Sequence, residues 1–209
     1  MEFSTSAGPA TAVVEPPAGD GAGPEFLLVL THGAGGGTET PDLLAASRAG
    51  REAGAVAVRV LQPYRVRGAR APGSALKQDA AWLEIVAVLR AAYPGLPLIQ
   101  GGRSNGARVA CRTAGAAGAA GVIALAFPLH PPGRGGSAEH SRADELRSAG
   151  VPVLVINGDR DPFGVPDRAD ADTLVVLPGQ THALSGSRQA VAGAVASWLP
   201  SVLGRAVSG

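Results

Sequence analysis

Six short hydrophobic runs recur along the chain, separated by longer segments of mixed polarity. They occupy residues 25–33, 55–63, 97–102, 121–129, 151–159 and 173–179. Each run is too short for a buried helix and too uniformly apolar for a strand with one face in water. Such runs are typical of strands inside a parallel sheet that is covered on both faces. The pattern therefore predicts about six core strands.

Segments with helical periodicity lie between these runs, at residues 41–53, 74–92, 105–115, 141–149 and 187–203. In the last segment, Val191, Val195 and Trp198 recur at three- and four-residue steps, which places them on one helix face. Strands that alternate with helices indicate right-handed βαβ units. The expected fold class is α/β, a doubly wound and mostly parallel sheet with helices on both faces.

The length of 209 residues suits one domain, expected at residues 25–203. Residues 1–24 are rich in Ala, Gly and Pro, which predicts a disordered arm, and residues 204–209 are expected to form a flexible tail. The first 25 residues lack the basic and apolar segments of a secretory signal, and no apolar run reaches the roughly 20 residues of a membrane helix. We therefore expect a cytoplasmic protein that does not bind membranes.

Composition and charge narrow the range of partners. The net charge of +1 gives no electrostatic reason to expect a nucleic-acid partner. A single cysteine excludes an intramolecular disulfide and a cysteine-based metal cluster. No metal or cofactor is predicted, and the oligomeric state stays open.

One hydrophobic run leads directly into a turn that reads Gly102-Arg103-Ser104-Asn105-Gly106 and then into a helical segment. This is a G-x-S-x-G nucleophile elbow in its required context, between a strand and a helix. Such a turn holds the serine in a strained backbone conformation, and the flanking glycines let the strand and helix approach. The turn therefore predicts that Ser104 is a nucleophile.

A serine hydroxyl needs an adjacent base, usually a histidine that a carboxylate orients. After an elbow of this type the acid comes next in the chain and the histidine last. Of the four histidines, only His182 follows every plausible acid. The acid is expected on the loop after the preceding hydrophobic run, where Asp161 is favoured. Asp159 is the alternative, although its side chain is also placed to cap the turn.

Two backbone N–H groups should stabilise the tetrahedral intermediate of such a reaction. One is expected from Asn105, which follows the nucleophile at the start of a helix. The other is expected from Ala34 or Gly35, in the Gly-rich segment 32–37 after the first hydrophobic run. A phosphate-binding loop is the alternative for this segment, but no Walker lysine or dinucleotide-binding fingerprint accompanies it.

Three further side chains are expected to contact the substrate. His32 opens the Gly-rich segment, Arg103 precedes the nucleophile, and His130 follows the fourth hydrophobic run. The alternatives are a structural salt bridge for Arg103 and a structural loop histidine for His130. The arginines of residues 65–70 are interpreted as a solvated basic loop, with an acidic substrate or product as the alternative.

The chain resembles an α/β-hydrolase over residues 25–203. The motifs that carry this resemblance are THGAGGG (31–37), GGRSNGARVA (101–110), FPLHPPG (127–133) and GDRDPFG (158–164), with His182 completing the set. More narrowly, the chain is similar to the small, lidless family of testis-expressed and chromatin-complex-associated hydrolase-like proteins, of dienelactone-hydrolase-like form. Asn105 stands where that family has Met or Gly, which alters the pocket and leaves the backbone N–H in place.

These residues predict a serine hydrolase that cleaves a carboxylic ester or thioester of a small acyl substrate through an acyl-enzyme. Residues 128–149 are too few and too rich in Pro and Gly for an independent helical cap, so an open site is expected. One alternative is a non-catalytic scaffold of the hydrolase fold, which the intact set of Ser, Asp and His disfavours. Another is a biosynthetic thioesterase or cyclase that uses the same residues.

Overall fold

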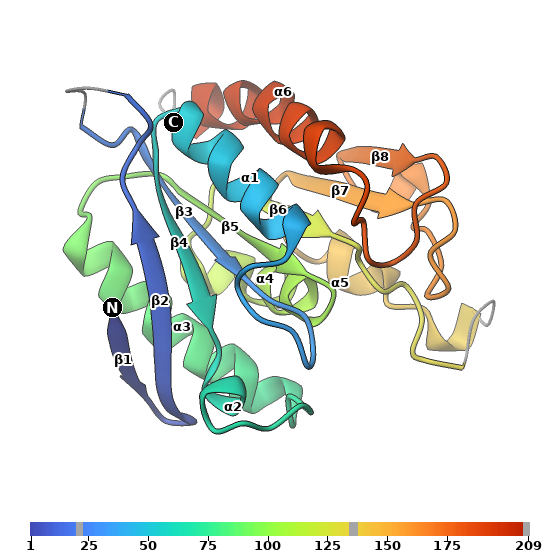
Figure 1. Ribbon diagram of the computed structural model, residues 1–209, viewed down its shortest axis with the longest axis horizontal. Coiled ribbons are helices and arrows are strands. Elements are labelled where there is room, and N and C mark those ends of the chain that lie inside the picture. The colour runs from blue at the N-terminus through green and yellow to red at the C-terminus, as the bar shows by residue number, and fades with distance from the viewer. Residues whose placement is uncertain (20–22, 134–137, 207–209) are drawn as a thin grey trace.

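Six parallel strands form most of the sheet, as the hydrophobic runs predict (Figure 1). They are β3 (Phe26–Thr31), β4 (Ala55–Leu61), β5 (Leu98–Arg103), β6 (Gly121–Leu125), β7 (Val153–Gly158) and β8 (Thr173–Leu177). The computed structural model describes residues 1–19, 23–133 and 138–206. Every residue of β3, β6 and β7 is buried, because helices cover both faces of the sheet. The predicted α/β class is confirmed.

Two N-terminal strands extend this sheet, which corrects the prediction of a disordered arm over residues 1–24. β1 (Glu2–Thr5) pairs antiparallel with β2 (Gly8–Glu15), and β2 pairs antiparallel with β4. The full strand order is β1-β2-β4-β3-β5-β6-β7-β8. The Ala- and Gly-rich composition concealed a short hairpin whose Phe3 and Ala10 pack into the core. Residues 20–22 lie outside the described residues.

Two layers of helices sandwich the sheet (Figure 1). α1 (Pro41–Glu52) and α6 (Arg188–Ala206) pack together on one face. On the other face, α4 (Asn105–Ala117) contacts both α3 (Ala75–Ala92) and α5 (Ala143–Arg147). α6 continues to Ala206, so the predicted tail is helical over residues 204–206, and residues 207–209 lie outside the described residues.

The carboxyl ends of the parallel strands meet at one edge of the sheet, where ligand sites of open α/β sheets form. The loops that leave this edge after β3, β5, β7 and β8 contain the residues predicted to be catalytic. A short helix, α2 (Pro63–Val66), follows β4 at the same edge. In the described part of residues 128–149, only the 3-10 turn η1 (Ala138–His140) and the short helix α5 are helical. No cap domain is therefore formed by those residues.

Within residues 1–19, 23–133 and 138–206, no helix is both long enough and apolar enough to span a membrane.

Candidate active site

Ser104 occupies the junction between β5 and α4 with a strained backbone. Its φ of 54° and ψ of −115° are unusual for a residue with a Cβ atom, and such conformations cost about 1–3 kcal/mol. The Ser104 amide donates a 2.9 Å hydrogen bond to the carbonyl of Leu125 on β6, and its carbonyl accepts one of 3.3 Å from Arg108. These two backbone hydrogen bonds, one from the Ser104 amide and one to its carbonyl, hold the residue in this conformation.

Glycines are required around the serine because three backbone segments converge there. A Cβ atom on Gly102 or on Gly106 would lie 2.6 Å from the carbonyl oxygen of Thr31 at the end of β3. A Cβ atom on Gly33 would lie 3.1 Å from the Cβ atom of Ser104. The elbow and the loop after β3 are therefore in direct contact.

The structure brings Ser104, His182 and Asp161 together at this edge of the sheet. The Ser104 Oγ atom lies 2.9 Å from His182 Nε2, and His182 Nδ1 lies 2.8 Å from Asp161 Oδ2. The Asp161 side chain is fully buried, whereas 18% of the His182 side chain is exposed. Asp161 Oδ2 accepts a hydrogen bond from the Nδ1–H group of His182, which leaves the Nε2 lone pair facing the serine hydroxyl.

The loop after β7 presents Asp161, not Asp159, to the histidine. Asp161 Oδ1 accepts a 2.9 Å hydrogen bond from the amide of Phe163, so both carboxylate oxygens are engaged. The Phe163 ring packs edge-on against the His182 ring, with centroids 4.5 Å apart and an interplanar angle of 74°. Asp159 is exposed to solvent. Of the two candidate acids, Asp161 is therefore the one that contacts His182.

Asn157, inside β7, fixes this acid loop and was not identified from the sequence. Its Oδ1 atom accepts from the amide of Phe127 at 2.8 Å, and its Nδ2 atom donates to the Phe127 carbonyl at 2.9 Å and to the Gly164 carbonyl at 3.3 Å. The buried amide therefore connects the segment after β6 to the acid loop. A polar residue within an otherwise apolar run was the available signal.

The elements predicted to supply the oxyanion hole lie beside the serine. Asn105 is the first residue of α4, where a backbone N–H has no partner within the helix. The helix dipole also places partial positive charge there. Across from it, Ala34 and Gly35 form a tight turn that the Gly36 amide closes on the Gly33 carbonyl at 3.1 Å. Gly35 has a φ of 68°, which glycine adopts without strain.

His32 is a structural residue, which corrects the expectation that it contacts substrate. Its Nε2 atom accepts from the Gln62 amide at 3.0 Å, and its Nδ1 atom donates to the Gly33 carbonyl at 2.8 Å. The imidazole is completely buried, and this burial lowers its pKa. The neutral ring therefore links the loop after β3 to the end of β4, with both nitrogens occupied.

Arg103 and His130 also make structural contacts. Arg103 Nε lies 2.8 Å from Oδ2 of the buried Asp42 on α1, and its Nη2 atom donates to the His182 carbonyl at 2.7 Å. His130 is 8% exposed and packs against Gly164, while its amide donates to the Phe163 carbonyl at 2.8 Å. These contacts favour the structural alternatives for both side chains.

The described residues contain no cluster of three or more His, Cys, Asp or Glu side chains that could hold a metal ion. At this edge of the sheet the structure places a serine hydroxyl beside an imidazole, which in turn contacts a buried carboxylate.

Several solved structures are similar to this chain over nearly its whole length. A lidless α/β serine hydrolase from Xanthomonas campestris is 25% identical, with a TM-score of 0.72 over 96% of this chain and 94% of its own. A serine hydrolase homologue from Coxiella burnetii is 17% identical, with a TM-score of 0.78 over 95% and 96%. Est1E from Butyrivibrio proteoclasticus, solved with ferulic acid bound, is 19% identical, with a TM-score of 0.74 over 98% and 99%.

Among curated proteins, none matches this chain significantly. The family model described as alpha/beta hydrolase domain matches residues 24–186, which is most of the chain. The protein therefore belongs to the alpha/beta hydrolase domain family.

Proposed function

We propose that this protein hydrolyses carboxylic esters or thioesters through an acyl-enzyme on Ser104. The observation that carries the proposal is the continuous contact from Ser104 Oγ to His182 Nε2 and from His182 Nδ1 to Asp161, with both distances below 3 Å. The similarity to a lidless serine hydrolase supports the same reaction class.

In the first half-reaction, Ser104 Oγ attacks the carbonyl carbon while His182 Nε2 takes the hydroxyl proton. Asp161 stabilises the imidazolium that forms. The carbonyl oxygen becomes an oxyanion, for which the Asn105 amide and an amide of Ala34 or Gly35 are the proposed donors. His182 then returns the proton to the leaving alcohol or thiol as the carbon–heteroatom bond breaks.

In the second half-reaction, water replaces the leaving group. His182 removes a proton from the water as it attacks the acyl carbon, and it returns that proton to Ser104 Oγ when the acid product leaves. The described segments near the site form no cap, so substrates reach it from solvent.

Two other functions use the same fold. A non-catalytic scaffold has no need of a buried carboxylate aligned on a histidine at 2.8 Å, and this alignment favours the enzyme. A biosynthetic thioesterase or cyclase would use the same residues. Parallel rates on acyl-thioesters and 4-nitrophenyl esters distinguish the two substrate classes.

Labelling with a fluorophosphonate probe tests the proposed nucleophile. We expect stoichiometric labelling of the wild-type protein, none of the Ser104→Ala variant, and full labelling of Ser148→Ala, which alters an exposed serine. Labelling that persists in Ser104→Ala, or an unlabelled wild-type protein, contradicts the proposal.

A further inference from the structure

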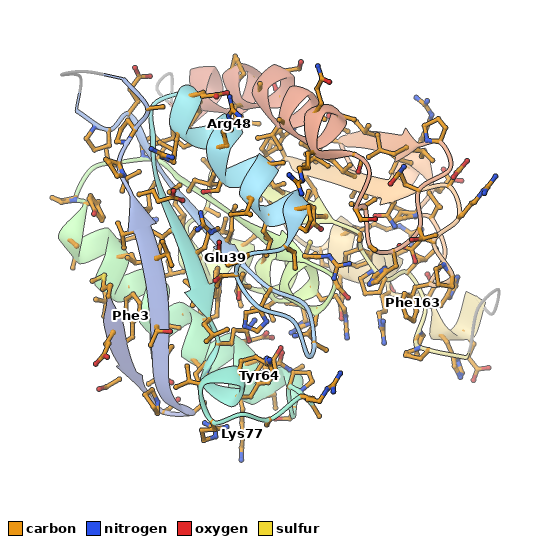
Figure 2. All side chains as sticks on the ribbon, viewed as in Figure 1. Phe3, Glu39, Arg48, Tyr64, Lys77 and Phe163 are labelled. Atoms are coloured by element: carbon orange, nitrogen blue, oxygen red, sulfur yellow. The ribbon has the colours of Figure 1, made fainter. Side chains whose placement is uncertain are left out.

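A groove opens between the turn that joins β1 to β2, α2, the segment 67–74 and the first turns of α3. Its volume is about 910 Å³, within the range of small-molecule sites. Its lining residues include Tyr64, Pro72, Leu76, Lys77, Gln78 and Ala81. Figure 2 shows Tyr64 and Lys77 at the same end of the molecule, where β4 leads into α2. This is the edge of the sheet that carries Ser104.

Two hydrogen bonds connect the groove wall to the residues that flank the nucleophile. Gln78 Oε1 accepts from Asn105 Nδ2 at 2.6 Å, and the Tyr64 hydroxyl donates to the Gly33 carbonyl at 3.3 Å. Burial raises the pKa of Tyr64 to about 12, so the phenol keeps its proton. The groove is therefore linked to the proposed oxyanion site through two of its lining side chains, Tyr64 and Gln78, which contact Gly33 and Asn105.

The groove combines apolar surface with positive charge. Leu76 is 83% exposed, more than any other large hydrophobic side chain of the described residues. The only charged side chains in the lining are Arg67 and Lys77, both basic. Arg67 donates to the Ala7 carbonyl, whereas Lys77 forms no ion pair with any described residue. This combination suits a ligand with an apolar body and an anionic end.

Of the two acidic residues of α3, Asp79 is paired with an arginine, whereas Glu84 keeps its negative charge near the Ser6 end of the groove. Asp79 is engaged by two hydrogen bonds, of 2.6 and 2.8 Å, from Arg112 on α4. Glu84, further along α3, accepts from the Ser6 amide at 2.7 Å. The side chain of Arg70 lies next to Gly35 and adds positive charge beside the oxyanion loop.

Building on the proposed hydrolase function, we propose that this groove binds one arm of the substrate and selects esters with a free carboxylate at the end of a short apolar arm. The carboxylate pairs with Lys77, assisted by Arg67, and the apolar arm lies along Leu76 and Pro72. Monoesters of dicarboxylic acids have this chemistry. The basic segment 65–70 then serves an acidic substrate, the alternative that the sequence left open.

Matched substrates test the preference. The values of kcat/KM are compared for neutral 4-nitrophenyl butyrate and two anionic esters, with the carboxylate on the acyl arm (4-nitrophenyl hydrogen glutarate) or on the leaving group (4-butyryloxybenzoate). We expect one anionic ester to be preferred about tenfold, as one charge-assisted contact allows. Lys77→Met should abolish this ratio and Leu76→Asp should invert it, whereas Arg168→Met, an exposed change remote from the groove, should preserve it. The proposal is overturned if neither anionic ester is preferred over the neutral ester, or if the preference is the same in Lys77→Met as in the wild type.

A binding experiment separates this inference from the proposed catalysis. Titration of monobutyl glutarate into Ser104→Ala by calorimetry reports on the groove whether or not the protein turns over any ester. We expect monobutyl glutarate to bind Ser104→Ala and to bind the double variant Ser104→Ala/Lys77→Met about tenfold more weakly. Absence of binding, or binding indifferent to Lys77→Met, contradicts the groove even if fluorophosphonate labels Ser104. Binding without any labelling of the wild type would instead contradict only the proposed reaction.

Discussion

Arg103 Nη2 donates a 2.7 Å hydrogen bond to the backbone carbonyl of His182, which lies 79 residues further along the chain. The same guanidinium lies 2.8 Å from the buried carboxylate of Asp42 at the start of α1. The side chain next to the proposed nucleophile therefore holds the loop of the proposed base. We therefore expect Arg103 to be a positioning residue that acts through the histidine and not on the substrate.

Replacing Arg103 should separate this positioning role from stability. Arg103→Met leaves the Asp42 carboxylate buried without its partner, which we expect to lower the free energy of unfolding by about 3–5 kcal/mol. In the double variant Arg103→Met/Asp42→Asn, stability should recover while kcat stays about 10- to 100-fold below wild type with little change in KM, an effect typical of misplaced groups. Urea unfolding and steady-state kinetics check this. Full recovery of kcat in the double variant would show that Arg103 is only structural.

The identity of the acid can be tested with a matched pair of substitutions two residues apart. Asp161→Asn removes the carboxylate that accepts from His182 Nδ1, and we expect kcat to fall by about 10⁴-fold, as when a triad aspartate is replaced. Asp159→Asn, at an exposed position, should stay within a few-fold of wild type. Kinetics of both variants decide the matter, and equal losses would contradict the assignment.

Buried His32 should make stability depend on pH. Its pKa is lowered from 6.5, chiefly by burial, so the unfolded chain binds a proton more readily than the folded protein does. The contribution of this residue is present above pH 6.5 and is lost as the pH falls below that value, by at most about 1.4 kcal/mol per pH unit.

Urea unfolding of wild type and His32→Asn between pH 5 and 7.5 measures this contribution. We expect the free energy of unfolding to fall more steeply with acid in the wild type than in the variant. Parallel pH profiles would mean that His32 does not carry the effect.

Cys111, on α4, should be inert until the protein unfolds. The thiol is buried, and burial raises its pKa, so the reactive thiolate is suppressed. We expect no reaction with a disulfide reagent such as dithionitrobenzoate in buffer and one thiol per chain in denaturant, since the chain has a single cysteine. Rapid labelling of the native protein would contradict the packing of α4 on the sheet.

The sequence predicted those features whose signal is local. Each hydrophobic run contains a strand, and the elbow, the acid loop and His182 follow strands whose carboxyl ends share one edge. The hairpin β1–β2 was missed because it lies in a segment rich in Ala, Gly and Pro. Its place in the sheet depends on the pairing of β2 with β4, more than 40 residues away, and no local pattern reports that pairing.

Side-chain roles were harder to predict than positions. His32 and Arg103 stand in the expected segments, but whether a side chain faces substrate or packs inward depends on residues brought in by the fold. For His32 these are Gln62 and Tyr64, and for Arg103 they are Asp42 and the His182 carbonyl. Such partners come from distant segments, so composition and spacing do not reveal them.

β8 is the least buried of the parallel strands, with only Leu177 fully buried, and it forms the outer edge of the sheet. The proposed base follows this strand, whereas the nucleophile follows the central strand β5. Local opening at a sheet edge requires less free energy than unfolding of the centre. Local opening of β8 would therefore displace the His182 imidazole while the core and Ser104 remain folded. We expect the proposed activity to fall with the opening of this outermost strand before spectroscopic signals of the whole sheet change.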